Sequence, residues 1–445
     1  MKVGFVSLGC SKNLIDTEMA IGLFKNNNFE IVNDVEKAEI IVINTCGFIE
    51  SAKQEAIDTI LEMAEYKEKG ICKFLIVMGC LVQRYSEELK KAIPEVDLFI
   101  TIDEYNEFWS RIEELIGVDG SVDPLKNIKN NYTELDYMER VITTGDKTAY
   151  LKIAEGCSNR CTYCAIPYIR GPYVSRPIEE ILEEAKKLAK QGIKELIVIA
   201  QDTTRYGEDL YGDAKLSELL NKLCDIDGFE WIRFLYAYPE SITDELIETV
   251  KKQDKICNYF DIPIQHISDK VLKRMNRRTT GKQIEELIKK IRTQIPDAIL
   301  RTSLIVGFPG ETEEDFEELY NFIKKGYFNK LGVFIYSKED GTPAARLKEQ
   351  IHHATKKKRY NLIMNIARDI SKENLKSCIG ENYKVLVENS TFDKKFYVGR
   401  SYMDIPDTDG MVIIKDTQEN IIGKFINCKI TDIKNYDLIG ELYNE

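Results

Sequence analysis

The chain has 445 residues, 43% of them hydrophobic and 31% charged, and its formal net charge is -12. At about 150 residues per domain, this length predicts roughly three domains. The amino-terminal MKVGFVSLGC lacks a signal-peptide layout, and no apolar stretch approaches the roughly 20 residues of a membrane span. We therefore expect a soluble, cytoplasmic protein without a membrane partner.

In the reducing cytoplasm, the eleven cysteines indicate metal or redox chemistry and not disulfides. The acidic balance argues against general binding of nucleic acid and is compatible with a basic protein partner. Direct binding of RNA at a local basic site stays open but is not favoured.

Residues 1–117 alternate short β-branched stretches with helical ones, which predicts a doubly wound parallel α/β domain. The expected strands are 3–8, 40–44, 74–78 and 97–101, and the expected helices are 14–25, 51–67, 87–92 and 105–116. Cys10, Cys46 and Cys80 each follow one of the first three strands. Because ligands gather at the carboxyl ends of parallel strands, these cysteines predict a three-thiolate site, with ordinary buried thiols as the alternative.

Residues 118–147 are polar and aperiodic, which is typical of a linker. Residues 148–375 return to alternating strands and helices. The expected strands are 150–154, 195–200, 231–237, 260–264, 299–306 and 331–336, and the expected helices are 178–190, 216–224, 244–253, 281–293 and 313–325. Six strand–helix units predict an incomplete (β/α)6 barrel with its active site at the carboxyl ends of the strands.

The segment CSNRCTYC follows the first of these strands. It places Cys157, Cys161 and Cys164 in a Cys-x3-Cys-x2-Cys array, which suits three corners of a cubane iron–sulfur cluster and leaves the fourth iron open. A structural zinc site would need a fourth ligand nearby, and neither His nor Cys follows within reach. Three scattered structural cysteines are the remaining alternative, but polar-flanked thiols this close rarely arise from packing.

Two further loops are expected on the same rim of the barrel. Gln201 opens a polar Gln-Asp-Thr segment after the second strand, and Gly307, Gly310 and Glu311 belong to GFPGET after the fifth. A glycine-rich turn that opens a helix offers backbone N–H groups to a nucleoside. Its alternative is a plain tight turn.

A basic helical stretch with KKKR at 356–359 is interpreted as a solvated face. Residues 376–445 then predict a small antiparallel β-barrel, with strands at 383–388, 396–400, 411–415 and 424–432. This segment has twelve acidic and nine basic residues. An acidic barrel is a poor clamp for RNA and fits a basic protein partner better.

CSNRCTYC, with an aromatic residue before its last cysteine, resembles the motif of the radical S-adenosylmethionine superfamily. The resemblance implies a [4Fe-4S] cluster on Cys157, Cys161 and Cys164, whose open iron chelates S-adenosylmethionine. It also implies cofactor contacts for Tyr163 beside the adenine, and for Gln201, Gly307, Gly310 and Glu311.

The three parts of the chain together resemble the methylthiotransferases of that superfamily. This resemblance implies a second [4Fe-4S] cluster on Cys10, Cys46 and Cys80, and a TRAM-like final domain for recognition of the substrate. It also implies a flavodoxin or ferredoxin as electron donor. A 5′-deoxyadenosyl radical would activate a C–H bond, and the second cluster would deliver methylated sulfur.

Four segments resemble the branch that modifies an aspartate of small-subunit ribosomal protein twelve. They are SLGCSKNLIDTE, FDIPIQHIS, YSKEDGTPA and GRSYMDIPDTDG. The transfer-RNA branch is closer to GCQMN and has a proline where Glu339 stands. A methylthiotransferase acting on adenosine in transfer RNA is therefore the main alternative. A non-catalytic iron–sulfur protein that binds RNA or senses iron or oxygen is a more distant one.

A few polar residues receive no role in this reading. His266 is interpreted as a hydrogen-bonded structural group and His352 and His353 as surface residues. The aspartates between 404 and 409 either meet a basic protein or are solvated turn residues.

Overall fold

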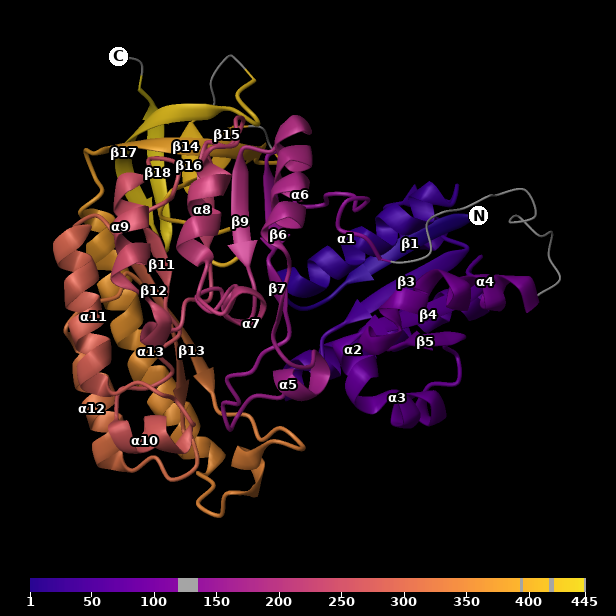
Figure 1. The fold of residues 1–445 in the computed structure, drawn as a ribbon, viewed down its shortest axis with the longest axis horizontal. Helices are drawn as coiled ribbons and strands as arrows, with labels where there is room; N and C mark the ends of the chain where they lie inside the picture. Colours follow the sequence, from indigo (N-terminus) through magenta and orange to yellow (C-terminus); the bar gives the residue numbers. More distant parts are fainter. Residues whose placement is uncertain (119–134, 393–394, 416–419, 444–445) are drawn as a thin grey trace.

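The computed structural model describes residues 1–118, 135–392, 395–415 and 420–443. An amino-terminal α/β sheet, a central half-barrel and a carboxy-terminal β-barrel follow one another along the chain (Figure 1). Most of the predicted linker, residues 119–134, lies outside the described residues. Of the remainder, Arg140 is buried and pairs with Glu18 and Glu184, so this part of the linker packs between the first two units.

The amino-terminal sheet is parallel throughout, in the order β2-β1-β3-β4-β5. Its central strands β3 and β4 are fully buried, because helices cover both faces. The prediction missed β2, a three-residue edge strand. The elements are β1 (Lys2–Ser7), β2 (Glu30–Val32), β3 (Ile40–Thr45), β4 (Phe74–Gly79), β5 (Leu98–Ile100), α1 (Ser11–Asn26), α2 (Glu50–Lys69), α3 (Cys80–Ala92) and α4 (Phe108–Val118).

Helix α3 begins at Cys80, seven residues before the predicted start. Tyr85, with φ of -135°, interrupts the helix, and the residues after it carry the helical pattern that the sequence shows. Helix α1 begins directly after Cys10, which is its N-cap residue. Two of the three cysteines of the predicted thiolate site, Cys10 and Cys80, therefore lie at helix amino termini.

The half-barrel consists of six parallel strands in chain order. β6, β9 and β10 form one sheet and β11, β12 and β13 a second, and an isolated parallel bridge between Ile232 and Ile256 connects the two. The predicted six-stranded incomplete barrel is confirmed. The strands are β6 (Thr148–Lys152), β9 (Glu195–Ile199), β10 (Trp231–Phe234), β11 (Tyr259–Asp261), β12 (Ile299–Val306) and β13 (Lys330–Ile335).

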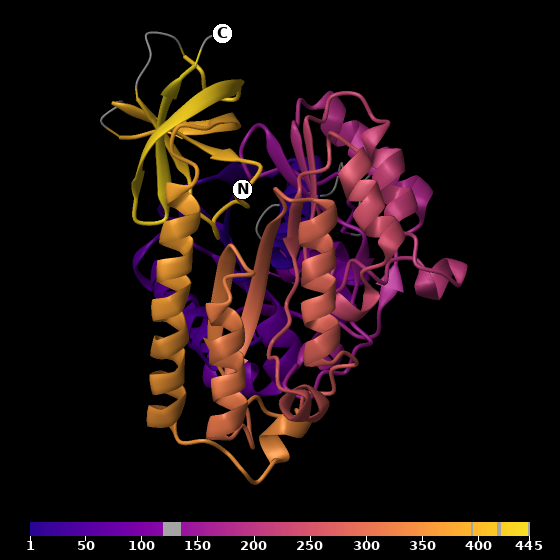
Figure 2. The same ribbon diagram turned by 90° about the vertical axis from the view of Figure 1, so that its left-hand side faces the viewer.

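Amphipathic helices cover the outside of the half-barrel (Figure 2). In α6, for example, Ile178, Ile181, Ala185 and Leu188 form the buried stripe. The covering helices are α6 (Ile178–Lys190), α8 (Leu216–Cys224), α9 (Asp244–Lys252), α11 (Gly281–Gln294), α12 (Glu313–Lys324) and α13 (His353–Lys376). Shorter helices are α5 (Ile166–Ile169), α7 (Glu208–Tyr211) and α10 (Asp269–Arg274), and β7 (Ala154–Glu155) pairs with β8 (Val174–Ser175).

The long helix α13, orange in Figure 2, leads into the closed carboxy-terminal barrel. The predicted small barrel is confirmed, with one addition: β16 and β18 pair in parallel, whereas the other four pairings are antiparallel. The prediction missed β18. The strands are β14 (Asn382–Ser390), β15 (Phe396–Ser401), β16 (Val412–Lys415), β17 (Phe425–Lys434) and β18 (Asp437–Leu442).

The carboxy-terminal barrel packs on the amino ends of the half-barrel strands, and in Figure 1 the arrow of β9 points away from it. Arg400 pairs with Glu195, the first residue of β9. The loop of residues 402–410 enters the half-barrel, where Met403 and Ile405 pack in one core with Ile197 and Ile199. This loop fills the amino-terminal part of the interior, so the opposite end remains for the site.

Both interpretations of the aspartates in this loop are wrong for Asp404 and Asp409. Asp404 pairs with Lys330, and Asp409 accepts a hydrogen bond from the Tyr259 hydroxyl at 2.7 Å. Their side chains are buried because the loop lies inside the half-barrel. They therefore anchor one domain to another and face neither solvent nor a partner protein.

Candidate active site

The cysteines of CSNRCTYC lie on the loop between β7 and α5 at the carboxyl end of the half-barrel. The N–H of Cys157 donates to the carbonyl of Gly171 at 3.1 Å, and the N–H of Thr162 donates to the carbonyl of Met275 at 3.1 Å. Asn276 donates to the carbonyl of Arg160 at 2.9 Å. The loop is thus held at its start and its middle by backbone from two different segments.

The environment of these thiols suits a metal cluster better than a free nucleophile. Burial raises the pKa of Cys157 to about 11, and burial followed by the neighbouring Cys161 raises that of Cys164 well above its ordinary value. Such thiols are protonated at neutral pH, and bound metal is what makes them thiolates. The donor set therefore fits an iron–sulfur cluster.

A buried arginine that the motif did not predict accompanies the loop. Nη1 of Arg277 lies 3.9 Å from Sγ of Cys161, and its guanidinium stacks on the Tyr238 ring at 4.2 Å. Nη2 donates to the carbonyl of Pro263 at 3.1 Å. A fixed positive charge beside a thiolate favours an anionic cluster there.

Cys10, Cys46 and Cys80 converge at the carboxyl edge of the amino-terminal sheet, as predicted. Their charges influence one another, and burial raises the pKa of Cys80 to about 12. Gly9 has φ of +94°, and a Cβ there would lie 2.8 Å from Cβ of Cys46. Only glycine allows this close approach with this backbone conformation.

The helix amino termini at Cys10 and Cys80 present partial positive charge to these thiols. The Cys80 thiol donates to Oδ1 of Asn13 at 3.4 Å, and that oxygen also accepts from Nη2 of Arg170 at 2.7 Å. The helix amino termini and the positive charge of Arg170 favour thiolates here, whereas the hydrogen bond to Asn13 holds the metal-free thiol in its protonated form. This group of thiols therefore also fits a cluster.

The two groups of thiols meet across α5. Cys80 packs against Ala165, the residue after Cys164, and against Ile169. Arg170, at the end of α5, pairs with Asp16 of α1 at 2.8 Å and with Glu155 at 3.0 Å. This contact brings together residues more than seventy positions apart in the sequence.

Lys152 completes a buried network of four charges by pairing with Asp16 and Glu155. Burial alone would raise the pKa of Glu155, but the charges of Arg170 and Lys152 outweigh it and hold that pKa well below its usual range. The network thus couples the amino-terminal domain to the β6 edge of the half-barrel.

Glu339 makes the corresponding contact at the other edge, after β13. Its buried carboxylate pairs with Arg84 and Lys53, both at 3.2 Å, and accepts the N–H of Glu50 at 3.1 Å. The amino-terminal domain is therefore attached to both edges of the half-barrel and extends across its mouth.

The GFPGET loop has a different internal arrangement from the predicted one. The Glu311 carboxylate accepts the N–H groups of Gly307 at 2.6 Å and Phe308 at 3.0 Å, and the N–H of Gly310 donates to the carbonyl of Glu349. These N–H groups already donate within the chain, so the expected backbone contact with a nucleoside is wrong for them. Contact of the loop with the cofactor stays a prediction.

The KKKR segment is a solvated face only at Lys357 and Lys358, which are exposed. Lys356 is buried and donates to the carbonyl of Tyr336 at 3.0 Å, whereas Arg359 pairs with Glu311 at 2.9 Å. A Cβ on Gly307, where φ is +74°, would lie 2.3 Å from Cγ of Lys356. These two basic residues therefore support the glycine loop.

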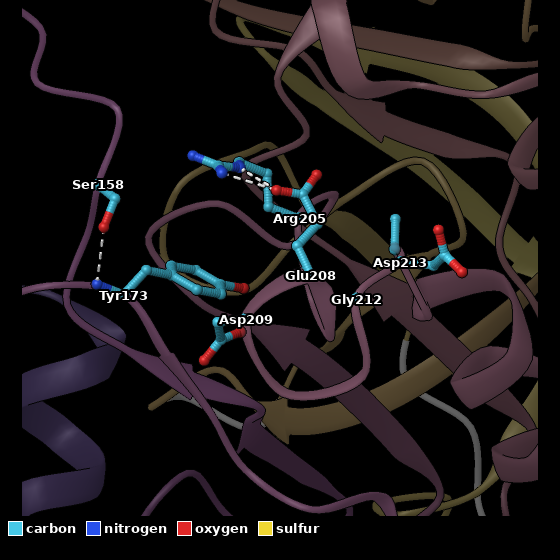
Figure 3. A pocket seen from close by; sticks show the side chains of 8 residues that line it. Ser158, Tyr173, Arg205, Glu208, Asp209, Gly212 and Asp213 are labelled. Carbon is cyan, nitrogen blue, oxygen red and sulfur yellow. Dashed lines mark hydrogen bonds and ion pairs between the residues drawn. The ribbon is translucent and has the colours of Figure 1, made fainter.

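Gln201 is half-buried at the rim, and its neighbour Asp202 is fully buried. Asp202 accepts from Asn159 of the cysteine loop at 2.7 Å and from Thr204, while burial raises its pKa to about 6. A polar cavity of about 450 Å³ lies beside this loop, lined by Ser158, Tyr173 and the Arg205–Glu208 pair (Figure 3). No cysteine lines it, so we place the site at the thiols and not in this cavity.

The histidines have the structural and surface places expected of them. Nδ1 of the buried His266 accepts the N–H of Ser268 at 3.0 Å, and burial lowers its pKa to about 3. His352 and His353 are exposed. Within the cysteine loop, Tyr163 packs with Val271 and Phe308.

In the part of the chain that the structure describes, no three His, Cys, Asp or Glu side chains are arranged to hold a single metal ion. A cubane cluster differs from such a site, because each thiolate binds a different iron and the thiolates stand further apart.

Three family profiles match successive parts of the chain. They are the uncharacterized protein family UPF0004 over residues 2–101, the Radical SAM superfamily over 151–323 and the TRAM domain over 379–442. The chain is 63% identical to the ribosomal protein uS12 methylthiotransferase RimO of Alkaliphilus oremlandii (strain OhILAs), with 100% of each chain covered. This chain belongs to the uS12 methylthiotransferase family.

A second family member, RimO of Acetivibrio thermocellus, is 51% identical, with 100% of this chain and 99% of that one covered. The suspected methylthiotransferase resemblance is confirmed, and the chain is a radical S-adenosylmethionine enzyme that uses an iron–sulfur cluster. None of the helices within the described residues is both long and apolar enough to cross a membrane.

Among solved structures, the chain is similar in fold to TsrM, a radical S-adenosylmethionine methyltransferase from Kitasatospora setae with cobalamin and a [4Fe-4S] cluster bound. The TM-score is 0.55 at 13% identity, with 77% of this chain and 76% of that one covered. At this identity the likeness concerns the fold alone.

Proposed function

We propose that this chain transfers a methylthio group to the β-carbon of an aspartate in ribosomal protein uS12. The observation that carries the proposal is full-length identity of 63% and 51% to proteins named uS12 methylthiotransferases. The mouth of the half-barrel supports it, because two groups of three thiols approach each other across α5. Activating a C–H bond and delivering sulfur are separate tasks, and the two groups divide them.

In this proposal Cys157, Cys161 and Cys164 hold one [4Fe-4S] cluster, and Cys10, Cys46 and Cys80 hold a second. When bound, the clusters and S-adenosylmethionine would supply two kinds of chemistry: they would remove hydrogen from an unactivated C–H bond, and they would provide methylated sulfur. Arg277 and Arg170 offset negative charge at the two sites. The contacts of Arg170 and Glu339 hold the amino-terminal domain over the mouth, which excludes water from the reaction.

The cofactor contacts follow from the same rim. Tyr163 lies in the cysteine loop, Gln201 follows β9, and Gly307, Gly310 and Glu311 form the loop after β12. In our proposal these residues line the binding site for S-adenosylmethionine. Glu311 acts by shaping the loop, because its carboxylate already binds two N–H groups of its own chain.

The remaining parts of the chain receive supporting roles. We assign residues 1–117 to sulfur delivery, 118–147 to a linker, 148–375 to the radical chemistry and 376–445 to recognition of basic uS12. Reduction comes from a flavodoxin or ferredoxin, and the protein acts in the cytoplasm, where thiols stay reduced.

Mass spectrometry of cells that lack the protein tests the proposal. We expect one uS12 peptide to lose the mass of a methylthio group that replaces hydrogen, and plasmid-borne wild type to restore it. Nucleosides from digested transfer RNA are measured in parallel. Loss of a methylthio nucleoside with intact uS12 modification would replace this proposal with the transfer-RNA alternative.

A further inference from the structure

Lys12 is a buried lysine whose ammonium has no carboxylate partner within residues 1–118, 135–392, 395–415 and 420–443. The residue is 3% exposed, and Nζ lies 3.2 Å from the centroid of the Tyr236 ring. A ring face attracts a cation, but more weakly than water or a carboxylate does. The charge of Lys12 is therefore only partly compensated.

The other buried lysines of the described chain are satisfied differently. Lys53 pairs with Glu50 and Glu339, and Lys152 pairs with Asp16 and Glu155. Lys356 donates to the carbonyl of Tyr336. Among these buried lysines, Lys12 is the one whose ammonium has neither a carboxylate nor a hydrogen-bond acceptor among the described residues.

The position of Lys12 connects the two groups of thiols. It lies in the first turn of α1, two residues after Cys10, while Tyr236 follows β10 at the carboxyl end of the half-barrel. The carbonyl of Tyr236 accepts the N–H of Thr203, in the rim loop that begins at Gln201. Lys12 therefore reaches from the amino-terminal thiols to the rim of the half-barrel.

Tyr236 is held in an unusual backbone conformation at this point. Its φ is +62°, a backbone region that residues other than glycine rarely occupy. Its N–H donates to Asp261 at 3.1 Å. Strain of this kind persists where neighbouring contacts fix it and is concentrated at functional sites. The backbone conformation of Tyr236 places its ring under the Lys12 ammonium.

We propose that Lys12 is the residue that pairs with the carboxylate of the substrate aspartate and selects aspartate for modification. This inference rests on the proposed function. The carboxylate supplies the counter-charge that Lys12 lacks, in a charge-assisted hydrogen bond. Because the β-carbon of aspartate is bonded directly to the carboxyl carbon, fixing the carboxylate also fixes the reacting carbon.

S-adenosylmethionine is a second source of a carboxylate at this mouth. The family resemblance assigns that carboxylate to the open iron of the cluster on the CSNRCTYC loop, whereas Lys12 belongs to α1 beside Cys10. The substrate is therefore the occupant that the position favours. An experiment must still separate the two sources.

The test compares binding of two substrates to enzyme reconstituted with its clusters and S-adenosylmethionine but without reductant. One substrate is recombinant uS12, and the other carries Asn at the aspartate that mass spectrometry identifies as modified by the wild type. We expect the wild type to prefer the aspartate form by about tenfold or more. Lys12→Met should bring the ratio of the two Kd values close to one.

Matched variants separate recognition from folding. Lys12→Arg keeps the charge and should retain most of the preference, and Lys12→Gln replaces Lys12→Met if the latter does not fold. Lys67→Met removes a partly buried lysine of the same domain whose partner Asp97 precedes β5, at the edge of the sheet opposite the thiols, and it should leave the ratio unchanged. A thermal unfolding curve for each variant reports on stability.

The inference is overturned if Lys12→Met keeps the preference, weakens both substrates equally, or weakens binding of S-adenosylmethionine instead. These outcomes require a wild type that methylthiolates uS12 once reductant is added. A wild type that leaves uS12 unmodified would overturn the proposed function, and this inference with it.

Discussion

The two groups of thiols differ in how the chain assembles them. Cys157, Cys161 and Cys164 lie within eight residues of one loop, whereas Cys10, Cys46 and Cys80 come from the ends of three strands. The first group needs a loop held by a few hydrogen bonds. The second exists only when the parallel sheet is complete.

The groups also differ in their access to solvent. In the first group, Cys157 and Cys161 are buried and Cys164 is half-buried. In the second group, Cys80 is buried, Cys46 is half-buried and Cys10 is exposed. Enclosure suits a step that must exclude water, and access suits a step that exchanges sulfur with the outside. Under the proposed function, one half-barrel mouth would combine a closed site for the radical step with a more open site for sulfur delivery.

Removing one cysteine from each group should have the largest effect on activity and should separate the roles of the two groups. We expect Cys161→Ala to abolish formation of 5′-deoxyadenosine, because three thiolates are needed to hold the cluster. Cys46→Ala should abolish methylthiolation of uS12 but leave some cleavage of S-adenosylmethionine. Chromatography of 5′-deoxyadenosine and mass spectrometry of uS12 measure the two activities.

Cys224→Ala is the matched control, because Cys224 is a buried cysteine on α8, outside both groups. It should retain both activities after reconstitution. Intact methylthiolation by Cys46→Ala would remove the sulfur-delivery role from the amino-terminal thiols.

The contact between the two groups should depend on Arg170. Arg170→Met should lower the free energy of unfolding by about 3–5 kcal/mol, because it removes the positive charge that pairs with Asp16 and Glu155. Urea denaturation followed by the fluorescence of Trp109 and Trp231 reports on the amino-terminal sheet and the half-barrel. Lys69→Met, which removes an exposed ion pair, should have no measurable effect. Equal curves for the two variants would mean that the network does not hold the domains together.

The enclosure of the radical site can be tested through Glu311. Burial raises its pKa from 4.5 to about 7, although Arg359 opposes the shift. Between these pH values the folded protein keeps a proton that the unfolded chain has released, so folding stability falls as pH rises. Relative to Glu311→Gln, the wild type should lose about 3 kcal/mol between pH 4.5 and 7, at 1.4 kcal/mol per pKa unit.

Denaturation curves of both proteins at several pH values from 4 to 8 provide the measurement, and above pH 7 their difference should stay constant. A difference that does not vary with pH would show that Glu311 is ionised throughout.

The smallest expected effect concerns the positive charge of Arg277 beside the cysteine loop. Arg277→Gln removes a positive charge 3.9 Å from the Cys161 sulfur, which should lower the reduction potential of that cluster by tens of millivolts. A redox titration followed by electron paramagnetic resonance measures the shift. The second cluster proposed on Cys10, Cys46 and Cys80 serves as internal control, and an equal shift in both potentials would point to a general change of the fold.

The strands that carry the site were predictable because they are buried on both faces. β3 begins with four apolar residues in a row and β4 with five, and each strand is followed by a cysteine, so sequence alone predicts that Cys46 and Cys80 lie at one sheet edge. The three residues of the edge strand β2 are too few to show a period, and Gly440 interrupts the apolar alternation in the six residues of β18. They were missed for these reasons.

The charged contacts were not predictable, since their partners are far apart in the sequence. Asp16 and Arg170 are 154 residues apart, and nothing near either residue indicates the other. Glu311 was singled out by its motif, but its contact with Gly307 requires the folded loop. Sequence patterns identify chemistry within a motif, whereas the enclosure around it depends on how separate domains pack.

The loop of residues 402–410 has a consequence for the order in which the protein is made. Ile197 and Ile199 of β9 are synthesised before Met403 and Ile405, which belong to the same buried core and leave the ribosome near the end of translation. The half-barrel interior therefore stays uncovered through most of translation. We expect metal loading to follow release of the finished chain, so an enzyme that modifies a ribosomal protein matures only after a ribosome has let it go.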